Sequence, residues 1–481
     1  MSIEFSVIFF ENYDKLNKHS LYKFCVVEVK GSPLPKSKAL KQSNDTVITD
    51  IAQQLDIYLV GGAVRDKLLN RPVKDNDYLV VGATVEQMLA LNFVQVGKDF
   101  PVFLHPTSKD EYALARTEKK QGSGYTGFSC HAAPDVTIEQ DLIRRDLTIN
   151  AMAIDNKGNI VDPYNGQSDL NKRKLRHVSD AFIEDPLRVL RVARFAARYH
   201  GEGFTIADET LALMTQISDS GELNTLSAER VWQEMQLTLA EGGIQGASPE
   251  VFFQVLYQCN ALKALWPELH ALWNVPNPAK WHPEICTGVH TMMVLQQAVR
   301  LTNTAEFSDK PNTQIAIRFA AICHDLGKGI TPESLWPSHR GHETTGLPLV
   351  EKICLQLKVP NQCKQLALKV CEHHLHCHKA FELKASTILR IFNQLDVWRK
   401  PDEFDDFLIG CKSDFLGRLG FENKSYDQEK YWKEAMLAAK EVQAKVFIEQ
   451  GIKGAAIKEH MDKARLDAIE KIKLKYESLN G

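Results

Sequence analysis

The sequence lacks the patterns of an exported or membrane-embedded protein. No run approaches the roughly 18 consecutive apolar residues that a membrane-spanning helix needs, and Glu4 stands where a signal peptide would have a basic start. The ten cysteines are scattered, and no two have the Cys-x-x-Cys spacing, so we expect reduced thiols. These absences predict a cytoplasmic protein with no membrane partner.

The chain also lacks an excess of either charge sign: it has 58 Lys and Arg and 61 Asp and Glu, and its formal net charge is −3. A nearly neutral chain does not attract polyanions as a whole, so a nucleic-acid partner would require a local basic stripe. The chain has 481 residues, which is too long for one hydrophobic core. It should therefore form about three or four domains.

Hydrophobic periodicity divides the chain into regions. Residues 1–54 have the composition of an extension or linker, and 55–170 combine short β-branched runs with a helical stretch, which is typical of a small α/β domain. From residue 171 onward the periodicity is helical. The predicted fold class is α+β, with a helical body over 171–280, a second helical domain over 281–420 and a helical tail over 421–481.

A glycine turn followed by paired aspartates gives the first chemical signal. A strand that runs into Gly61 and Gly62 and continues as a helix lets backbone amides approach a phosphate, with Arg65 one turn into that helix. Asp75 and Asp77 are two residues apart on the next predicted strand, so both carboxylates project from the same face. Converging carboxylates without His or Cys suit Mg²⁺. A solvated turn and a helix cap are the structural alternatives.

A basic stripe lies farther along the chain. The segment from residue 172 to 198 contains eight Lys and Arg against three acids. Its arginines are spaced three or four apart on one predicted helical face: Arg188, Arg191, Arg194 and Arg198. An ion-paired, solvated face is the usual explanation of such a run, but the acids within this segment are too few to pair with it.

Histidines and aspartates of the C-terminal half form a second constellation. The candidate metal ligands are His290, His324, Asp325, His374 and Asp414. Mixed nitrogen and oxygen ligands favour a transition metal such as Ni²⁺, Co²⁺ or Mn²⁺ over Mg²⁺. His339 and His342 are weaker candidates, and a single histidine packs more often than it binds. On that ground His373, His376 and His378 are expected to be bystanders.

These motifs together resemble the class II tRNA nucleotidyltransferases, or CCA-adding enzymes, in their long gammaproteobacterial form. The matching stretches are GGAVRD, KDNDYLVVG, RRDLTINAMA, DPYNGQSDL, EDPLRVLRVARFAARY, AERVWQE and CHDLGKG. They stand in the family's order between about residues 57 and 420. The resemblance implies a small polymerase-β-like nucleotidyltransferase head, an all-α neck and body, and an all-α HD phosphohydrolase domain.

The resemblance also implies roles for individual residues. Asp75 and Asp77 would hold Mg²⁺, with Glu111 as the candidate third carboxylate and the neighbouring Asp110 as the open alternative. The nucleotide would be contacted by Gly62, Arg65, Arg145, Arg191 and Arg194.

Base selection can be argued from hydrogen-bonding groups. Cytosine and adenine each present an exocyclic amino donor beside a ring-nitrogen acceptor, so a carboxylate next to a guanidinium accepts both and rejects uracil and guanine. The resemblance places Asp185 and Arg188 in this role, and i,i+3 spacing on a helix would set them side by side. A simple cap at the helix start is the alternative for Asp185.

The implied function is template-independent addition and repair of the 3′-terminal CCA of tRNA from CTP and ATP. The HD domain would add phosphatase, 2′-nucleotidase and 2′,3′-cyclic phosphodiesterase activity. A bacterial poly(A) polymerase shares the head and is the alternative, but the HD signature argues against it. We expect a monomer or a homodimer.

Overall fold

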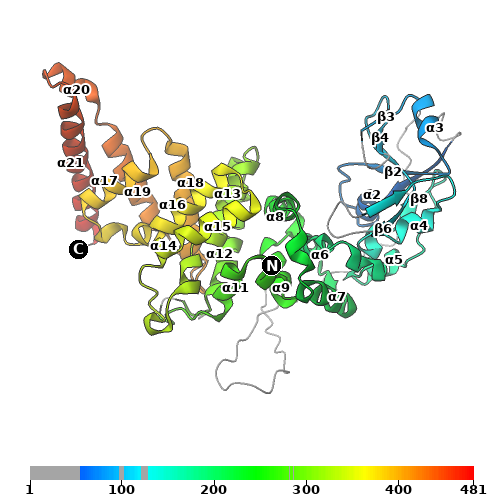
Figure 1. Cartoon of the computed structure of the whole chain (residues 1–481). Helices are drawn as coiled ribbons and strands as arrows, with labels where there is room; N and C mark the ends of the chain where they lie inside the picture. Colours follow the sequence, from blue (N-terminus) through cyan, green and yellow to red (C-terminus); the bar gives the residue numbers. More distant parts are fainter. Residues whose placement is uncertain (1–54, 97–101, 121–127, 281, 285, 481) are drawn as a thin grey trace. The chain divides into compact units, whose positions relative to one another are not determined.

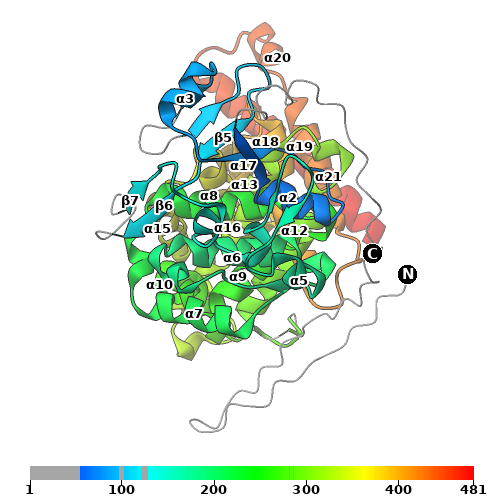
Figure 2. The same cartoon turned by 90° about the vertical axis from the view of Figure 1, so that its right-hand side faces the viewer.

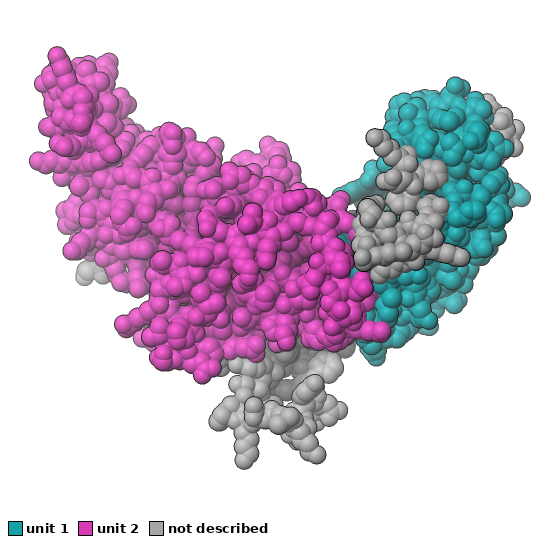
Figure 3. Space-filling model, in the orientation of Figure 1, with its two compact units in different colours: residues 1–188, 198–213 teal, residues 189–197, 214–481 magenta. Residues whose placement is uncertain are grey.

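The structure, a computed structural model, describes residues 55–96, 102–120, 128–280, 282–284 and 286–480 (Figure 1). The extension predicted for residues 1–54 lies outside this described part. The chain forms two compact units (Figure 3): residues up to 188 together with 198–213, and residues 189–197 together with 214 onward. Helices α6 (Leu187–Arg198) and α7 (Asp208–Asp219) contribute residues to both units.

The first unit is built on a seven-stranded sheet of order β3-β4-β5-β2-β1-β8-β9. Its strands are β1 (Asp56–Val60), β2 (Asp77–Val81), β3 (Val94–Gln95), β4 (Val102–Leu104), β5 (Glu111–Leu114), β8 (Ala153–Ile154) and β9 (Ile160–Val161). Two ribbons accompany it, β6 (Thr117–Lys120) with β7 (Phe128–His131), and β10 (Lys174–Leu175) with β11 (Thr205–Ile206). β2 pairs in parallel with β5 and antiparallel with β1, which makes β2 a central strand.

Both faces of the sheet are covered, and β2 shows why. Val80 packs with Met88 and Phe103 in one core cluster, whereas the adjacent Leu79 packs with Leu142 in another. Side chains alternate across a strand, so the apolar run of β2 fills two cores. The helices of this unit are α2 (Gly62–Leu68), α3 (Val85–Ala90), α4 (Ile138–Leu142) and α5 (Gly166–Asn171). α3 and α4 each begin with a Thr-x-x-Gln capping box, which satisfies amides at the helix start.

The second unit is helical. Its helices are α8 (Ala228–Glu241), α9 (Pro249–Gln258), α10 (Ala261–Leu265), α11 (Pro267–Ala271), α12 (Thr287–Thr302), α13 (Pro311–Cys323), α14 (His342–Thr345), α15 (Leu347–Leu357), α16 (Asn361–His378), α17 (Ala385–Leu395), α18 (Pro401–Leu416), α19 (Asp427–Lys440), α20 (Ala444–Glu449) and α21 (Ala455–Asn480). The short 3₁₀ turn η9 (Leu326–Ile330) follows α13. The prediction of an α/β head followed by helical regions is confirmed.

Four helices of this unit pack against one another: α12, α13, α16 and α18 lie side by side (Figures 1 and 2). Glycine allows one of these approaches, because a Cβ at Gly410 of α18 would lie 2.9 Å from Cγ2 of Val370 on α16. The close contact brings the following turn of α18 toward the end of α16. No helix in the described part of the chain is long and apolar enough to cross a bilayer.

Candidate active sites

The glycine turn lies between β1 and α2, as its sequence predicts. Gly61 has φ +67°, which favours glycine, and a Cβ there would lie 2.8 Å from Nη1 of Arg145. Gly62 begins α2. Arg65 is buried, and its guanidinium donates to Oδ1 of Asn150 at 2.5 Å and Oδ1 of Asp66 at 2.9 Å. The glycine turn is therefore bordered by two guanidinium groups, those of Arg65 and Arg145.

Three carboxylates meet at the ends of β2 and β5. Asp77 begins β2 and is the direct parallel partner of Glu111, the first residue of β5, while Asp75 lies two residues earlier. Asp77 is solvent-exposed as a residue. Even so, partial desolvation of its carboxyl, followed by the charges of Glu111 and Asp75, raises its pKa despite the opposing charge of Arg145. Like charges gathered in this way favour a bound cation.

A buried carboxylate that sequence reasoning missed holds Arg145. Asp141 on α4 is fully buried. Its Oδ2 lies 3.2 Å from Nη2 of Arg145, and its Oδ1 lies 2.7 Å from Nη2 of Arg144 and 3.3 Å from the backbone N of Arg116. Burial raises the pKa of Asp141, but the two guanidinium groups outweigh it and hold that pKa below its usual value. The signal in the sequence was the Asp-x-x-Arg-Arg spacing, which fits one helical turn.

The two base-selection candidates are placed differently from the helical pair that was expected. Asp185 precedes α6 in an extended conformation, and its Oδ1 accepts from the backbone N of Leu187 at 3.1 Å, as a capping residue does. The guanidinium of Arg188 donates to the carbonyl oxygens of Ala181 at 2.8 Å and Arg144 at 2.5 Å. Backbone contacts therefore fix the position of Arg188.

The next two arginines of α6 share one acid. Nε of the buried Arg194 lies 2.6 Å from Oε2 of Glu234 on α8, and Nη1 of Arg191 lies 3.9 Å from Oε1 of the same residue. Glu234 lies 40 residues beyond Arg194, so the local count of acids could not reveal it. The next arginine in the stripe, Arg198, lies 3.6 Å from Asp66. Part of the basic stripe is thus ion-paired.

The candidate ligands of the second unit come together from its four packed helices. His290 lies on α12, His374 on α16 and Asp414 on α18, while His324 and Asp325 follow the end of α13. All five are buried. Nε2 of His290 lies 3.0 Å from Oδ1 of Asp414, and Nε2 of His324 lies 3.2 Å from Oδ2 of Asp325. Five residues spread over 125 positions of sequence thus form one buried cluster.

The structure adds His342 to this cluster. Its Nε2 lies 3.1 Å from Oδ1 of Asp325 and 3.3 Å from Nε2 of His374. A Cβ at Gly327 would overlap the carbonyl oxygen of His342, so this glycine lets α14 approach η9 closely. We expected His342 to be a weaker candidate, because a single histidine packs more often than it binds a metal.

A second layer of residues orients the cluster. Nε2 of His378 lies 2.6 Å from Oδ2 of Asp414, and its Nδ1 lies 3.0 Å from the hydroxyl of Tyr426. Oε1 of Glu284 lies 2.9 Å from Nδ1 of His290, on the opposite side of that ring from Asp414. Such contacts fix the orientation of a metal-binding imidazole or carboxylate. His378, expected to be a bystander, therefore supports Asp414.

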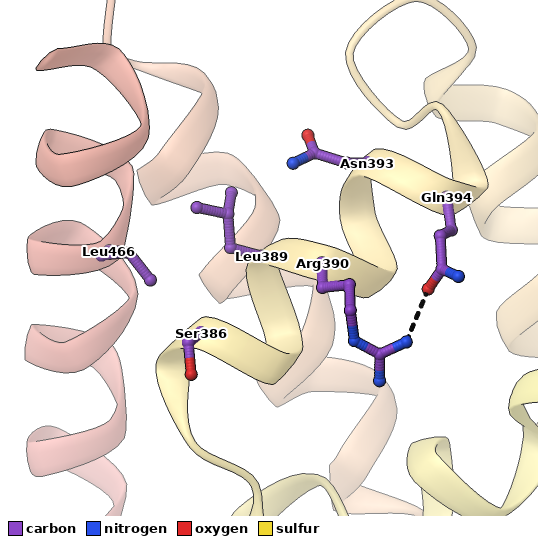
Figure 4. Close-up of a pocket in the computed structure, with 6 residues that line it drawn as sticks. All are labelled: Ser386, Leu389, Arg390, Asn393, Gln394 and Leu466. Carbon is purple, nitrogen blue, oxygen red and sulfur yellow. Dashed lines mark hydrogen bonds between the residues drawn. The ribbon is translucent and has the colours of Figure 1, made fainter. Parts of the chain in front are cut away.

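The remaining histidines lie outside the cluster. Nε2 of His339 lies 2.7 Å from the carbonyl oxygen of Pro276, and His373 and His376 contact each other as rings, with centroids 5.9 Å apart. A separate hollow between α17 and α21 is lined by Ser386, Leu389, Arg390, Asn393, Gln394 and Leu466 (Figure 4). None of its lining residues belongs to either cluster.

Charged neighbours distinguish Asp325 from an ordinary buried carboxylate. Burial raises the pKa of Asp325, but His324 and Lys328 outweigh it and hold the pKa well below its usual value. Nζ of Lys328 lies 2.7 Å from Oδ2 of Asp325. Burial lowers the pKa of His374 well below its usual value, which favours the neutral form of its imidazole. Neutral imidazoles beside ionised carboxylates are the form in which these side chains bind divalent metals.

Comparison with known families identifies three regions. The poly A polymerase head domain matches residues 57–176, the probable RNA and SrmB-binding site of polymerase A matches 203–272, and the HD domain matches 287–398. Each candidate cluster lies mainly within one of these regions.

Curated relatives match nearly their whole length. The multifunctional CCA protein of Pseudoalteromonas atlantica is 57% identical over 415 residues, covering 86% of this chain and 99% of the relative. That of Mannheimia succiniciproducens is 55% identical over 416 residues, covering 86% and 97%. Solved structures share the fold at 18% identity: a CCA-adding enzyme with ATP (TM-score 0.59, covering 91% of this chain and 95% of that one) and a Thermotoga maritima CCA-adding enzyme complexed with tRNA (TM-score 0.54, 91% and 97%).

The buried Asp141 gives the head a pH-dependent stability. Because its pKa is lowered in the folded state, the ionised carboxylate stabilises the head at neutral pH, and that contribution is lost as the pH falls through the folded pKa. Asp141→Asn should reduce the free energy of opening of the head by about 3 kcal/mol at pH 7, and by less in acid.

Hydrogen exchange of peptides from α4 and β2 measures this opening. Tryptophan fluorescence is unsuitable, because every tryptophan lies at residue 232 or beyond, outside the head. Glu139→Gln, an exposed carboxylate on the same helix, is the matched control and should change little. Equal protection in Asp141→Asn and the control would show that the Asp141 ion pairs do not stabilise the head.

Proposed function

The chain belongs to the multifunctional CCA proteins, which are long CCA-adding enzymes with an HD domain, and we propose how its residues serve the two activities. It adds and repairs the 3′-terminal CCA of tRNA, and its HD domain indicates a metal-dependent phosphohydrolase. We place the head at residues 55–170, the neck and body at 171–280, and the HD domain at 281–420. ATP, CTP and tRNA are its proposed partners.

The carboxylates at the ends of β2 and β5 are the proposed catalytic centre of nucleotide addition. Asp75, Asp77 and Glu111 would hold Mg²⁺, an ion that prefers oxygen ligands and triphosphates. The register of β2 with β5 favours Glu111 over Asp110, because Glu111 is the direct partner of Asp77. When bound, Mg²⁺ would neutralise triphosphate charge and activate the 3′-hydroxyl of the tRNA. Arg145, held by Asp141, supplies a positive charge beside these carboxylates.

The nucleotide would be held near the glycine turn and the start of α6. Gly62 and Arg65 lie at the turn, and Asp185 and Arg188 at the start of α6. We assign Asp185 and Arg188 to the base edge, where a carboxylate and a guanidinium match both cytosine and adenine. The two backbone carbonyls that fix Arg188 support this assignment, because selection without a template needs groups that do not move. Arg191 and Arg194 are proposed contacts to the incoming nucleotide, supported by resemblance alone.

Substitution of the carboxylates at the ends of β2 and β5 tests their assignment to the metal. Asp77→Asn and Glu111→Gln should each slow the addition of both C and A by at least about a hundredfold, since they weaken a metal contribution worth several kcal/mol. Asp110→Asn, one residue from Glu111, is the matched control and should retain activity. Incorporation of labelled CTP and ATP into tRNA that lacks CCA provides the measurement. Near-normal addition by Asp77→Asn would remove the carboxylate centre from the mechanism.

Substitution of Arg188 tests base selection. Arg188→Ala and Arg188→Lys should both relax discrimination against UTP and GTP by about tenfold or more, because neither replacement offers a fixed planar donor and one lost hydrogen bond corresponds to about 1.4 kcal/mol. Competition assays with mixed nucleotides measure the ratio of incorporation rates. Slower addition with unchanged selectivity would mean that Arg188 only supports the fold.

Substitution of His374 separates the HD activity from CCA addition. The HD cluster, made of imidazole and carboxylate groups, would hold a transition metal such as Ni²⁺, which when bound activates water for hydrolysis of phosphate esters. His374→Ala should abolish hydrolysis of a 2′,3′-cyclic phosphate and leave CCA addition unchanged. His376→Ala, two residues away on α16, should leave both activities intact. Loss of both activities in His374→Ala, with the protein still folded by circular dichroism, would argue against independent sites.

A further inference from the structure

We infer that Tyr199 is a positioning residue for nucleotide addition, which acts through Asp66 to hold Arg65 in place for the triphosphate. The inference rests on the proposed contact of Arg65 with the nucleotide. Tyr199 directly follows α6, while Arg65 and Asp66 belong to α2. All three residues lie in the first compact unit. A side chain 133 positions beyond Asp66 thus reaches the helix that follows the glycine turn.

Two contacts fix the plane of the Arg65 guanidinium. Its Nε lies 2.9 Å from Oδ1 of Asp66, and its Nη1 donates to Oδ1 of Asn150 at 2.5 Å. A guanidinium is planar, so contacts at two of its nitrogens also set the direction of the third. That nitrogen, Nη2, lies at the glycine turn, because a Cβ at Gly62 would be 3.4 Å from it. The orientation of Arg65 at the turn therefore depends on the position of the Asp66 carboxylate.

The Asp66 carboxylate is held in turn by Tyr199. The hydroxyl of Tyr199 donates to Oδ1 of Asp66 at 3.1 Å, and this is the same oxygen that accepts from Arg65. Asp66 and Tyr199 are both buried, and a hydrogen bond to a charged group is strengthened in the protein interior. Burial raises the pKa of Tyr199 to about 12, which favours the protonated hydroxyl, the form that donates.

The ring of Tyr199 has contacts of its own. The guanidinium carbon of Arg71 lies 4.7 Å from the ring centroid, and that of Arg65 lies 5.3 Å from it. Such contacts between a cation and an aromatic face are attractive. Nε of Arg71 also lies 3.1 Å from Oε1 of Glu202. We therefore expect the ring to stay in place when only the hydroxyl is removed, so that Tyr199→Phe isolates the hydrogen bond to Asp66.

Steady-state kinetics of CTP and ATP addition by the full-length chain test the inference. Tyr199→Phe should raise the KM of both nucleotides by about tenfold, the effect of one lost hydrogen bond to a charged partner. The kcat and the KM for tRNA should stay unchanged, because a phosphate contact that is present before and during the reaction contributes uniform binding. Tyr164→Phe is the matched control in the same unit, since it removes a hydroxyl that donates to the carbonyl oxygen of Glu139 at 2.9 Å. It should change none of these constants.

A double-mutant cycle with Arg65→Gln tests whether Tyr199 acts through Arg65. Arg65→Gln alone should raise the KM of both nucleotides. Adding Tyr199→Phe should raise it no further, because the side chain that Tyr199 positions is then absent. Effects that multiply would overturn the inference, as would an unchanged KM in Tyr199→Phe beside a raised one in Arg65→Gln, and both results would leave the nucleotide contact of Arg65 standing.

An unchanged KM in Arg65→Gln would contradict the nucleotide contact of Arg65 and the inference with it. If Arg65→Gln fails to fold, as judged by hydrogen exchange of peptides from β2, Tyr199→Phe decides alone. A rise confined to the KM of the nucleotides supports positioning, whereas a parallel fall in kcat would show that the hydroxyl only supports the fold.

Discussion

Two buried aspartates, Asp325 and Asp414, impose the arrangement of the larger unit. An ionised carboxylate in a protein interior costs several kcal/mol unless other charges or hydrogen bonds compensate it. The compensation here comes from helices far apart in the sequence: α12 brings His290 to Asp414, and α16 brings His378. The packing of α12, α13, α16 and α18 is therefore inseparable from the chemistry at their centre.

The head contains two kinds of carboxylate, one buried with cationic partners and one exposed among other carboxylates. Asp141 is buried and fully paired with arginines, so it belongs to the scaffold and fixes Arg145. Asp77 is exposed as a residue, and its pKa is raised, first by partial desolvation of its carboxyl and then by the neighbouring carboxylates. A paired carboxylate stabilises the fold, whereas a group of unpaired ones is left to bind a cation. This contrast separates the residues that build the head from those that we assign to catalysis.

Local sequence patterns predicted the elements well and their long-range contacts poorly. The strand, glycine turn, helix and second strand around Gly61 and Asp77 follow from residue order, because each depends on neighbouring residues. The pairing of Arg194 with Glu234 and the approach of His342 to Asp325 depend on tertiary packing. No spacing rule within one helix contains that information.

Strand register and helix boundaries explain the other differences between the sequence predictions and the structure. Alternation along one strand could not choose between Asp110 and Glu111, since the choice depends on the parallel pairing of β5 with β2. The side-by-side placement of Asp185 and Arg188 assumed a helix through both residues, but α6 begins at Leu187. The residue before a proline is disfavoured in helical conformation, which explains why Asp185 lies outside α6.

The most direct test of the two metal centres is the anomalous scattering of crystals grown with Mn²⁺ and a nonhydrolysable ATP analogue. We expect peaks at Asp75 and Asp77 in the head and separate metal scattering within the cluster of His290, His324, Asp325, His374 and Asp414 in the HD domain; peaks at neither set of residues would contradict the account of two distinct metal centres.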